Sequence, residues 1–228
     1  MDKKHKRVTL HKGHLTYALV TLAIILVLYF FVDKDSSFFF NKVRGNSVFY
    51  HIFFSMQYTV NIFVSIVPFI CIYLVVMLCL KHFFYFEQLL FMVTTSLFFA
   101  TAITNILKKI FGRYWTETFI KDNLSLIKTK TYGFDFFHGD LEHASFPSGH
   151  ATVIFAVMTV LWIMCPKLRW LSVFMCTVVV VGLLGCNFHF PSDIVAGAFI
   201  GIISAVFVLH VSQIYTKNLE EYTEQKDD

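Results

Sequence analysis

Long apolar segments separated by short polar ones make up most of this chain. The first apolar segment runs from Tyr17 to Val32 and is interrupted only by Thr21. A helix needs about 20 apolar residues to cross a bilayer, and several segments approach that length. Pro68 falls inside the second segment, where a membrane helix tolerates it as a kink. The pattern predicts six transmembrane helices, over residues 17–32, 59–80, 88–110, 150–165, 170–186 and 193–215.

Composition favours a membrane protein over a soluble one. Hydrophobic residues make up 57% of the chain, with 28 Phe and only 4 Pro, whereas soluble domains are nearer to about 45–50% apolar. A large soluble helical core is the alternative, and it would require several unusually long apolar helices. The net charge of +4 is too small to indicate a nucleic-acid partner. We therefore expect an all-α polytopic membrane protein in which residues 1–228 form one membrane domain.

The polar segments indicate how the chain is oriented. Several Lys and Arg precede the first span within residues 1–14, and such a short basic flank favours a cytoplasmic N-terminus. With six spans, both termini are expected in the cytoplasm. Residues 33–50 are then an external loop lying partly in the interface, and 111–146 form a large extracytoplasmic loop. The acidic tail, 216–228, is expected to be disordered in the cytoplasm.

The cysteines and two glycines add little to this prediction. The five Cys lie mostly in or beside apolar runs without CxxC spacing, which indicates buried thiols and neither a disulfide framework nor a zinc site. Gly197 and Gly201 are four residues apart in the last predicted span. This spacing permits close packing against another helix, although the glycines are equally well read as incidental.

Three polar clusters fall on one side of the membrane in this topology. They are the end of the third helix (Lys108 to Arg113), the start of the fourth (Ser148 to His150) and the turn before the sixth (His189 to Asp193). An odd number of spans between any two of them would have separated them. The topology therefore predicts one extracytoplasmic site at the ends of three helices.

The residue types in these clusters are suited to nucleophilic catalysis. His189 and Asp193 are four residues apart, within contact range if helical. An Asp beside an imidazole fixes the tautomer and stabilises the imidazolium, which favours His189 as a nucleophile. His150 is expected to act as the general acid for the leaving group. Taken singly, the His189–Asp193 pair is also compatible with a local ion pair, and His150 with an interfacial polar anchor.

Phosphoryl oxygens would find donors beside these histidines. Helix starts bind anions because their first N–H groups lack partners. We expect Ser148, the N–H groups of Gly149 and His150, and Lys108 to hold and neutralise such oxygens. No metal or other cofactor is required. Polar residues of the 111–146 loop are more typical of a solvated face, although they could attract an anionic headgroup; these are Lys128, Lys130, His138 and His143.

These residues resemble the type 2 phosphatidic acid phosphatase (PAP2) family, whose motifs are KxxxxxxRP, PSGH and SRxxxxxHxxxD on a six-helix core. Residues 147–150 match the second motif, while His189 and Asp193 match the third and Lys108 the first. The resemblance covers about 88–205, the expected catalytic core. It implies a bundle of the PAP2 type in an integral membrane protein of the bacterial inner membrane, with the site facing the periplasm.

Two motif positions depart from the family pattern. The Arg-Pro of the first motif falls on Trp115-Thr116, and the Ser-Arg of the third falls on Gly182-Leu183. Loss of two guanidiniums weakens phosphate binding. Arg113 and Asn187 are the candidate replacements. The alternatives are a different substrate, help from the basic loop, or an inactive relative.

The resemblance implies metal-independent hydrolysis of a lipid phosphate through a phosphohistidine on His189. The substrate would be lipid A, undecaprenyl pyrophosphate, phosphatidylglycerophosphate or phosphatidic acid. A lipid phosphotransferase on the same site is one alternative, and a non-catalytic membrane transporter or binder is another. Beyond the lipid and the bilayer, the sequence indicates no obligate protein partner and no nucleic acid.

Overall fold

The computed structural model describes residues 13–81, 84–120 and 122–227, all of them in helices, turns and loops. The basic segment before residue 13, on which the cytoplasmic N-terminus was predicted, lies outside the described residues. The α-helices are α1 (His14–Phe31), α2 (Asp33–Arg44), α3 (Ser47–Cys79), α4 (Tyr85–Phe111), α5 (Leu126–Thr129), α6 (Gly149–Met164), α7 (Arg169–Gly185) and α8 (Pro191–Asp227). Two 3-10 turns, η1 (Leu141–His143) and η2 (Pro166–Leu168), complete the elements.

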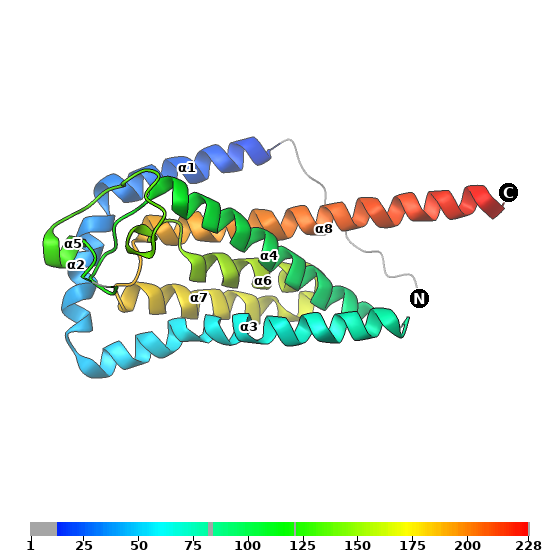
Figure 1. Ribbon diagram of the computed structural model, residues 1–228, viewed down its shortest axis with the longest axis horizontal. Helices are drawn as coiled ribbons and strands as arrows, with labels where there is room; N and C mark the ends of the chain where they lie inside the picture. The colour runs from blue at the N-terminus through cyan, green and yellow to red at the C-terminus, as the bar shows by residue number, and fades with distance from the viewer. Residues whose placement is uncertain (1–12, 82–83, 121, 228) are drawn as a thin grey trace.

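The long helices form one bundle with α6 at its centre (Figure 1). Helix α6 packs against α4, α7 and α8, and eight of its residues are buried. It is apolar on all sides, as expected for a helix surrounded by protein. Its Ile154 and Val157 pack with Val60 of α3 and Leu183 of α7 in the main hydrophobic core. The outer helix α3, in contrast, leaves most of its apolar side chains exposed.

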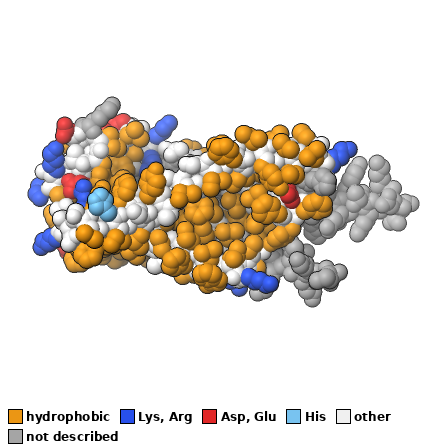
Figure 2. Space-filling model, turned by 90° about the horizontal axis from the view of Figure 1, so that it is seen from below, with side chains coloured by type: hydrophobic (Ala, Val, Ile, Leu, Met, Phe, Trp, Pro, Cys, Tyr) orange, Lys and Arg blue, Asp and Glu red, His pale blue; other side chains and the backbone are white. Residues whose placement is uncertain are grey.

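Hydrophobic side chains cover a broad face of the molecule between charged residues at its two ends (Figure 2). Within the described residues, four helices are long and apolar enough to cross a membrane, or five if α1 and α2, bent by 62°, count as one span. The all-α polytopic membrane fold is therefore confirmed. The predicted count of six is not met by length, because α6 has only 16 residues, or about 24 Å of helix.

Residues 33–50 were wrongly predicted to be a loop. They contain α2, which has Asp33 and Asp35 in its first turn and Lys42 and Arg44 in its last, an arrangement that complements the helix dipole. Asn46 then caps α3, its side chain accepting from Val48 N (3.0 Å) and Phe49 N (3.4 Å). As a result α3 begins twelve residues earlier than the predicted span 59–80.

The other predicted spans agree with the observed helices to within a few residues as far as residue 215. Pro68 lies inside α3 as predicted. The backbone of α8 remains helical through Asp227, so the prediction of a disordered tail from 216 is wrong, and α8 extends beyond the other helices (Figure 1).

Gly197 and Gly201 are needed for the packing of α8 against α6. A Cβ on Gly197 would lie 2.3 Å from the carbonyl oxygen of Ser148, and one on Gly201 would lie 2.5 Å from that of Thr152. Any larger side chain would force the two helices apart. This close approach lets Ser148 N donate to Asp193 O (3.0 Å), which joins the starts of α6 and α8.

Candidate active site

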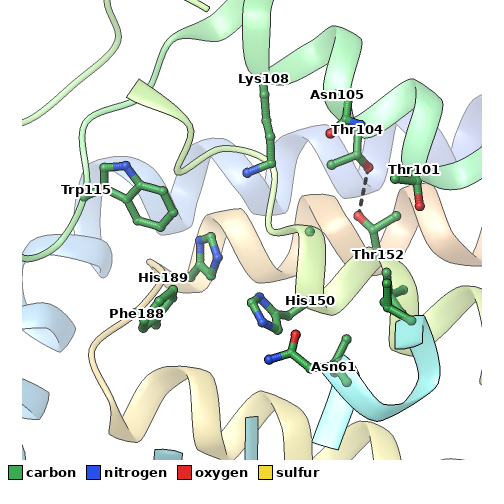
Figure 3. A pocket seen from close by; sticks show the side chains of 14 residues that line it. Asn61, Thr101, Thr104, Asn105, Lys108, Trp115, His150, Thr152, Phe188 and His189 are labelled. Atoms are coloured by element: carbon green, nitrogen blue, oxygen red, sulfur yellow. Dashed lines mark hydrogen bonds between the residues drawn. The ribbon is translucent and has the colours of Figure 1, made fainter. Parts of the chain in front are cut away.

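A cavity of about 260 Å³ lies among α3, α4, the start of α6 and the loop that leads into α8. Lys108 of α4, Gly149 and His150 of α6, and His189 of the loop all line it (Figure 3). The three polar clusters that the topology put on one side of the membrane therefore meet in one place. The remaining walls are Val60, Asn61, Val64, Thr101, Thr104, Asn105, Trp115, Thr152, Val153 and Phe188.

His189 is held between the cavity and the carboxylate of Asp193. Its Nδ1 lies 3.5 Å from Asp193 Oδ2, and Nδ1 has no closer hydrogen-bond partner among the described residues. That carboxylate oxygen is fixed by Ser145 Oγ (2.8 Å) and Phe190 N (3.1 Å). Because Nδ1 faces the carboxylate, Nε2 is the nitrogen available for a bond to substrate.

The environment of His189 favours a neutral imidazole. Its side chain is only 2% exposed. Burial lowers the pKa of His189 below the usual 6.5, since the desolvation of an imidazolium outweighs the opposing attraction of Asp193. A neutral imidazole retains the lone pair that a nucleophile requires.

His150 faces the same cavity from the second position of α6. The ring centroids of His150 and His189 are 6.4 Å apart (Figure 3). A group held between two imidazoles at this separation can be approached by both. The two histidines therefore line one cavity within reach of the same bound group.

The start of α6 supplies backbone donors. Gly149 and His150 are the first two residues of the helix, so their N–H groups have no intrahelical acceptor. The hydroxyl of Ser148, however, accepts from Ala151 N (3.4 Å) as the helix cap, and Ser148 is fully buried outside the cavity lining. Ser148 therefore shapes the helix start, and the backbone of Gly149 faces the cavity.

Lys108 brings a positive charge to the cavity. Its ammonium donates to Ala144 O and lies 5.8 Å from the centre of the Trp115 ring. Among the residues that line the cavity, Lys108 is the one Lys or Arg. An anion bound here would meet this ammonium and the free N–H groups of α6.

Comparison with known families agrees with this geometry. The family model described as the PAP2 superfamily matches residues 89–217, more than half of the chain. The chain belongs to the PAP2 superfamily. The matched region contains Lys108, His150, His189 and Asp193, the residues on which the three-motif resemblance rested.

The chain is similar in sequence to the bacitracin transport permease protein BcrC of Bacillus licheniformis. It is 33% identical over 64 residues, which are 28% of this chain and 32% of the relative. The alignment thus spans less than a third of either protein. No solved structure matches the chain.

Arg113, predicted to replace the arginine of the first PAP2 motif, does not line the cavity. Its side chain is fully buried and lies between two carboxylates. It donates from Nη2 to Asp33 Oδ2 (2.7 Å) and from Nη1 to Asp193 Oδ1. Burial alone would lower the pKa of Arg113, but Asp193 and Asp33 together hold that pKa above its usual value. The prediction of a phosphate contact from Arg113 therefore needs correction.

Asn187, the other predicted replacement, also points away from the cavity. Its Oδ1 accepts from Ser37 Oγ (3.0 Å) of α2, and its carbonyl accepts from Thr116 Oγ1. The backbone of Asn187 is left-handed, with φ 51°, a conformation that Asn adopts more readily than most residues. In this structure Asn187 turns the chain between α7 and the His189 loop.

Apolar side chains occupy the positions of both missing PAP2 arginines. Trp115, at the first, lines the cavity with its ring centroid 5.3 Å from that of His189, and its Nε1 donates to Leu141 O (2.9 Å). Leu183, at the second, is fully buried in the main core. A Cβ on the neighbouring Gly182 would lie 2.6 Å from Gln57 N, so α7 packs too closely on α3 to hold the motif serine.

The polar residues of the 111–146 loop lie apart from the cavity. His143 Nδ1 contacts Asp140 Oδ1 (2.7 Å), and His138 Nδ1 contacts Asp135 Oδ1 (3.1 Å). Lys128 pairs with Asp122 at a distance of 3.0 Å, with both side chains mostly exposed. The exposed Lys128 and His138 fit the solvated face that the sequence favoured, whereas the His143 side chain is only 14% exposed and packs against the Tyr114 ring.

Sequence reasoning missed the roles of Asp33 and Trp115. Asp33 lies at the junction of α1 and α2, fully buried, and contacts the pair formed by Arg113 and Asp193. An acidic residue immediately after an apolar span, Tyr17–Val32, was the available signal, but it is also typical of an ordinary span end. For Trp115 the sequence shows only a departure from the first motif.

Proposed function

We propose that this chain is a membrane phosphatase that hydrolyses a lipid phosphate through a phosphohistidine on His189. The observation that carries the proposal is the convergence of His189, His150 and Lys108 on one cavity, with Asp193 behind the nucleophile. Membership of the PAP2 superfamily supports a phosphatase-type reaction. The site is expected on the extracytoplasmic face of a bacterial inner membrane.

The reaction requires two displacements at phosphorus. In the first, the lone pair of His189 Nε2 forms the N–P bond while the P–O bond to the lipid breaks. The departing oxygen takes its electron pair and a proton from His150. In the second, water attacks phosphorus and gives a proton to the now neutral His150. The P–N electron pair returns to Nε2, which regenerates the free enzyme and releases phosphate.

Binding of the phosphoryl oxygens is assigned to Lys108 and to the N–H groups of Gly149 and His150. Donors fixed before the reaction stabilise developing charge without having to reorganise. Lys108 is a flexible point charge and cannot reproduce the bidentate contacts of two arginines. The site therefore suits a phosphate monoester of modest charge better than a pyrophosphate.

Neutral polar side chains further define the substrate class. Asn61 of α3 and Thr101 and Asn105 of α4 line the cavity, and their side chains have no hydrogen-bond partner among the described residues. Thr101, Asn105 and Lys108 follow one face of α4 at spacings of four and three residues. A glycerol or sugar phosphate lipid presents oxygen atoms to these groups, whereas a polyprenyl chain does not.

The test is turnover by the purified protein on a panel of lipid phosphates, with a chelator present, for wild type, His189→Ala and His150→Ala. We expect phosphate release by wild type, loss of release in His189→Ala, and strong reduction in His150→Ala. Full activity in both variants would overturn the proposal. Loss of wild-type activity in chelator would contradict the metal-independent mechanism.

Transport is the second candidate, and the name of the Bacillus licheniformis relative, a transport permease, favours it. A transporter or binder predicts that His189→Ala leaves cellular activity unchanged. A phosphotransferase on the same site is distinguished by its products, since release of free phosphate without an acceptor lipid supports the hydrolase.

A further inference from the structure

A second group of charged side chains lies behind the nucleophile, sealed from the cavity. Asp33, Arg113 and Asp193 are each 0% exposed, and Arg113 bridges the two carboxylates. Asp33 belongs to the α1–α2 junction, outside the region 89–217 matched by the family model. The N-terminal part of the chain therefore reaches the carboxylate that faces His189.

The contacts of Asp33 are extensive for a residue at a helix junction. Its Oδ2 accepts from Arg113 Nη2 (2.7 Å), from the Ser192 hydroxyl and, at 3.4 Å, from the hydroxyl of Tyr132. Its Oδ1 accepts from Ser192 N (3.0 Å). Ser192 immediately precedes Asp193, so Asp33 holds both the arginine and the start of α8.

The guanidinium is divided between the two carboxylates. Arg113 directs Nη2 to Asp33 and Nη1 to both Asp193 Oδ1 and Ser192 Oγ (2.6 Å). The other oxygen of Asp193 remains for Ser145, Phe190 N and His189. Without Asp33, the same guanidinium would be left with Asp193 as its one carboxylate partner.

The charge balance of this cluster is incomplete before the reaction. Two carboxylates and one guanidinium carry a net charge of −1 when His189 is neutral. Attack on phosphorus converts His189 into an N-phosphorylated imidazolium and brings the cluster to neutrality. In a buried site charges interact strongly, so a cluster poised at −1 stabilises the cation that forms.

We propose that Asp33 is a positioning residue of this reaction. Its carboxylate partly neutralises the guanidinium of Arg113, so that the negative charge of Asp193 remains available to stabilise the positive charge that forms on His189. The inference rests on the proposed phosphohistidine mechanism. Asp33 acts through Arg113 and Asp193 and touches no reacting atom. Removal of its charge leaves a neutral Arg113–Asp193 pair with less attraction for an imidazolium.

The test compares Asp33→Asn, Arg113→Gln and the double variant, with Asp35→Asn as the matched control. Asp35 is an exposed carboxylate in the same first turn of α2. Rates are expressed as kcat per folded binding site, counted by titration with inorganic phosphate as a competitive ligand. We expect Asp33→Asn to lower kcat roughly 10- to 100-fold, by analogy with residues that orient metal-binding histidines, with KM little changed.

The double variant provides the sharpest outcome, since it restores a net charge of −1 through Asp193 alone. Its kcat per site should exceed that of Asp33→Asn, whose cluster is neutral, and Asp35→Asn should match wild type. If Asp33→Asn does not fold, the double variant is compared with wild type instead, because both clusters carry a net charge of −1 and the kcat per site should be largely retained. A merely structural role would lower the amount of folded protein and leave kcat per site unchanged.

Two kinds of failure are distinguishable. Wild-type turnover that depends on His189 but is unaltered in Asp33→Asn would overturn the role of Asp33 alone. A double variant no faster than Asp33→Asn would do the same. Absence of His189-dependent turnover in wild type would overturn the phosphohistidine mechanism and this inference with it.

Discussion

The two sides of His189 use positive charge in opposite ways. On the cavity side, Lys108 and the first residues of α6 line the cavity. On the buried side, Arg113 is enclosed by Asp33 and Asp193 and exposes no surface. A guanidinium that the sequence predicted to be a substrate ligand instead lies behind His189, between two carboxylates.

The two sides of His189 should therefore respond differently to the loss of a cation. Substrate supplies the anion that Lys108 lacks, so the cavity side is complete only when it is occupied. The buried side is already paired, and removal of one member would leave an uncompensated charge away from water. The same change, loss of one cation, should therefore alter binding on one side and stability on the other.

The largest expected effects come from replacing the cation on each side of His189 with Gln. Lys108→Gln should raise KM and the inhibition constant of inorganic phosphate roughly 10- to 100-fold, since a hydrogen bond to a charged group contributes about 1.5–3 kcal/mol. Arg113→Gln should instead lower the free energy of unfolding by about 3–5 kcal/mol. Steady-state kinetics and denaturation in detergent would measure the two.

The distinction between a binding cation, Lys108, and a structural cation, Arg113, would be wrong if the two variants behaved alike. An unchanged phosphate inhibition constant in Lys108→Gln would remove the cavity cation from the binding scheme. A fully stable Arg113→Gln with a raised KM would return Arg113 to the role that the sequence first assigned it. Asn46, an exposed helix cap, offers a stability reference, since Asn46→Ala should cost only about 1 kcal/mol.

The second prediction concerns pH and sharpens the buried side of the comparison. His189 must be neutral to attack, and burial lowers its pKa below 6.5 despite the attraction of Asp193. Protonation of His189 therefore lowers activity as pH falls through this lowered pKa, whereas any loss as pH rises would come from deprotonation of His150, the proposed general acid. The acidic limb of kcat/KM, which reports the free enzyme, should have its midpoint below pH 6.5.

The substrate phosphate titrates in a nearby range, so its own pKa has to be measured and its contribution separated. A remaining acidic midpoint at or above 6.5 would show that the imidazole is better hydrated, or more strongly held by Asp193, than the structure indicates. The effect is smaller than that of Lys108→Gln, because it is confined to acidic solution.

Much of the architecture followed from the apolar pattern alone. The predicted helix 150–165 is observed at Gly149–Met164, and 170–186 at Arg169–Gly185. Spacing between apolar segments also brought three polar clusters to one side of the bundle. These successes share one cause, since membrane helices are defined by length and apolarity, which are local properties of a sequence.

The errors arose where a side chain's direction depends on distant parts of the chain. Arg113 follows Gly112, whose left-handed φ of 56° ends α4 and redirects the backbone. A Cβ on Gly112 would lie 1.8 Å from Asp135 O, so the turn is fixed by the returning loop. The partner of Arg113 at Asp33 is 80 residues earlier, and no spacing rule connects the two.

The smallest expected effect concerns the neutral polar groups of the cavity. Asn61→Ala and Asn105→Ala should each lower kcat/KM roughly 3- to 10-fold for a glycerol or sugar phosphate lipid, because a neutral hydrogen bond contributes about 0.5–1.5 kcal/mol. Water-soluble phenyl phosphate, which lacks those oxygens, should be hydrolysed equally by variants and wild type. Ile62→Ala, at an exposed apolar position beside Asn61, is the matched control.

The pattern across substrates decides the interpretation. A loss confined to oxygen-bearing lipids indicates that α3 and α4 bind the leaving group, while Lys108 and α6 bind the phosphate. An equal loss on phenyl phosphate would mean that Asn61 and Asn105 act on the phosphoryl group itself. In that case these amides would bind the phosphoryl group in place of the missing arginines. Phosphate binding would then depend less on Lys108 than the charge of Lys108 implies.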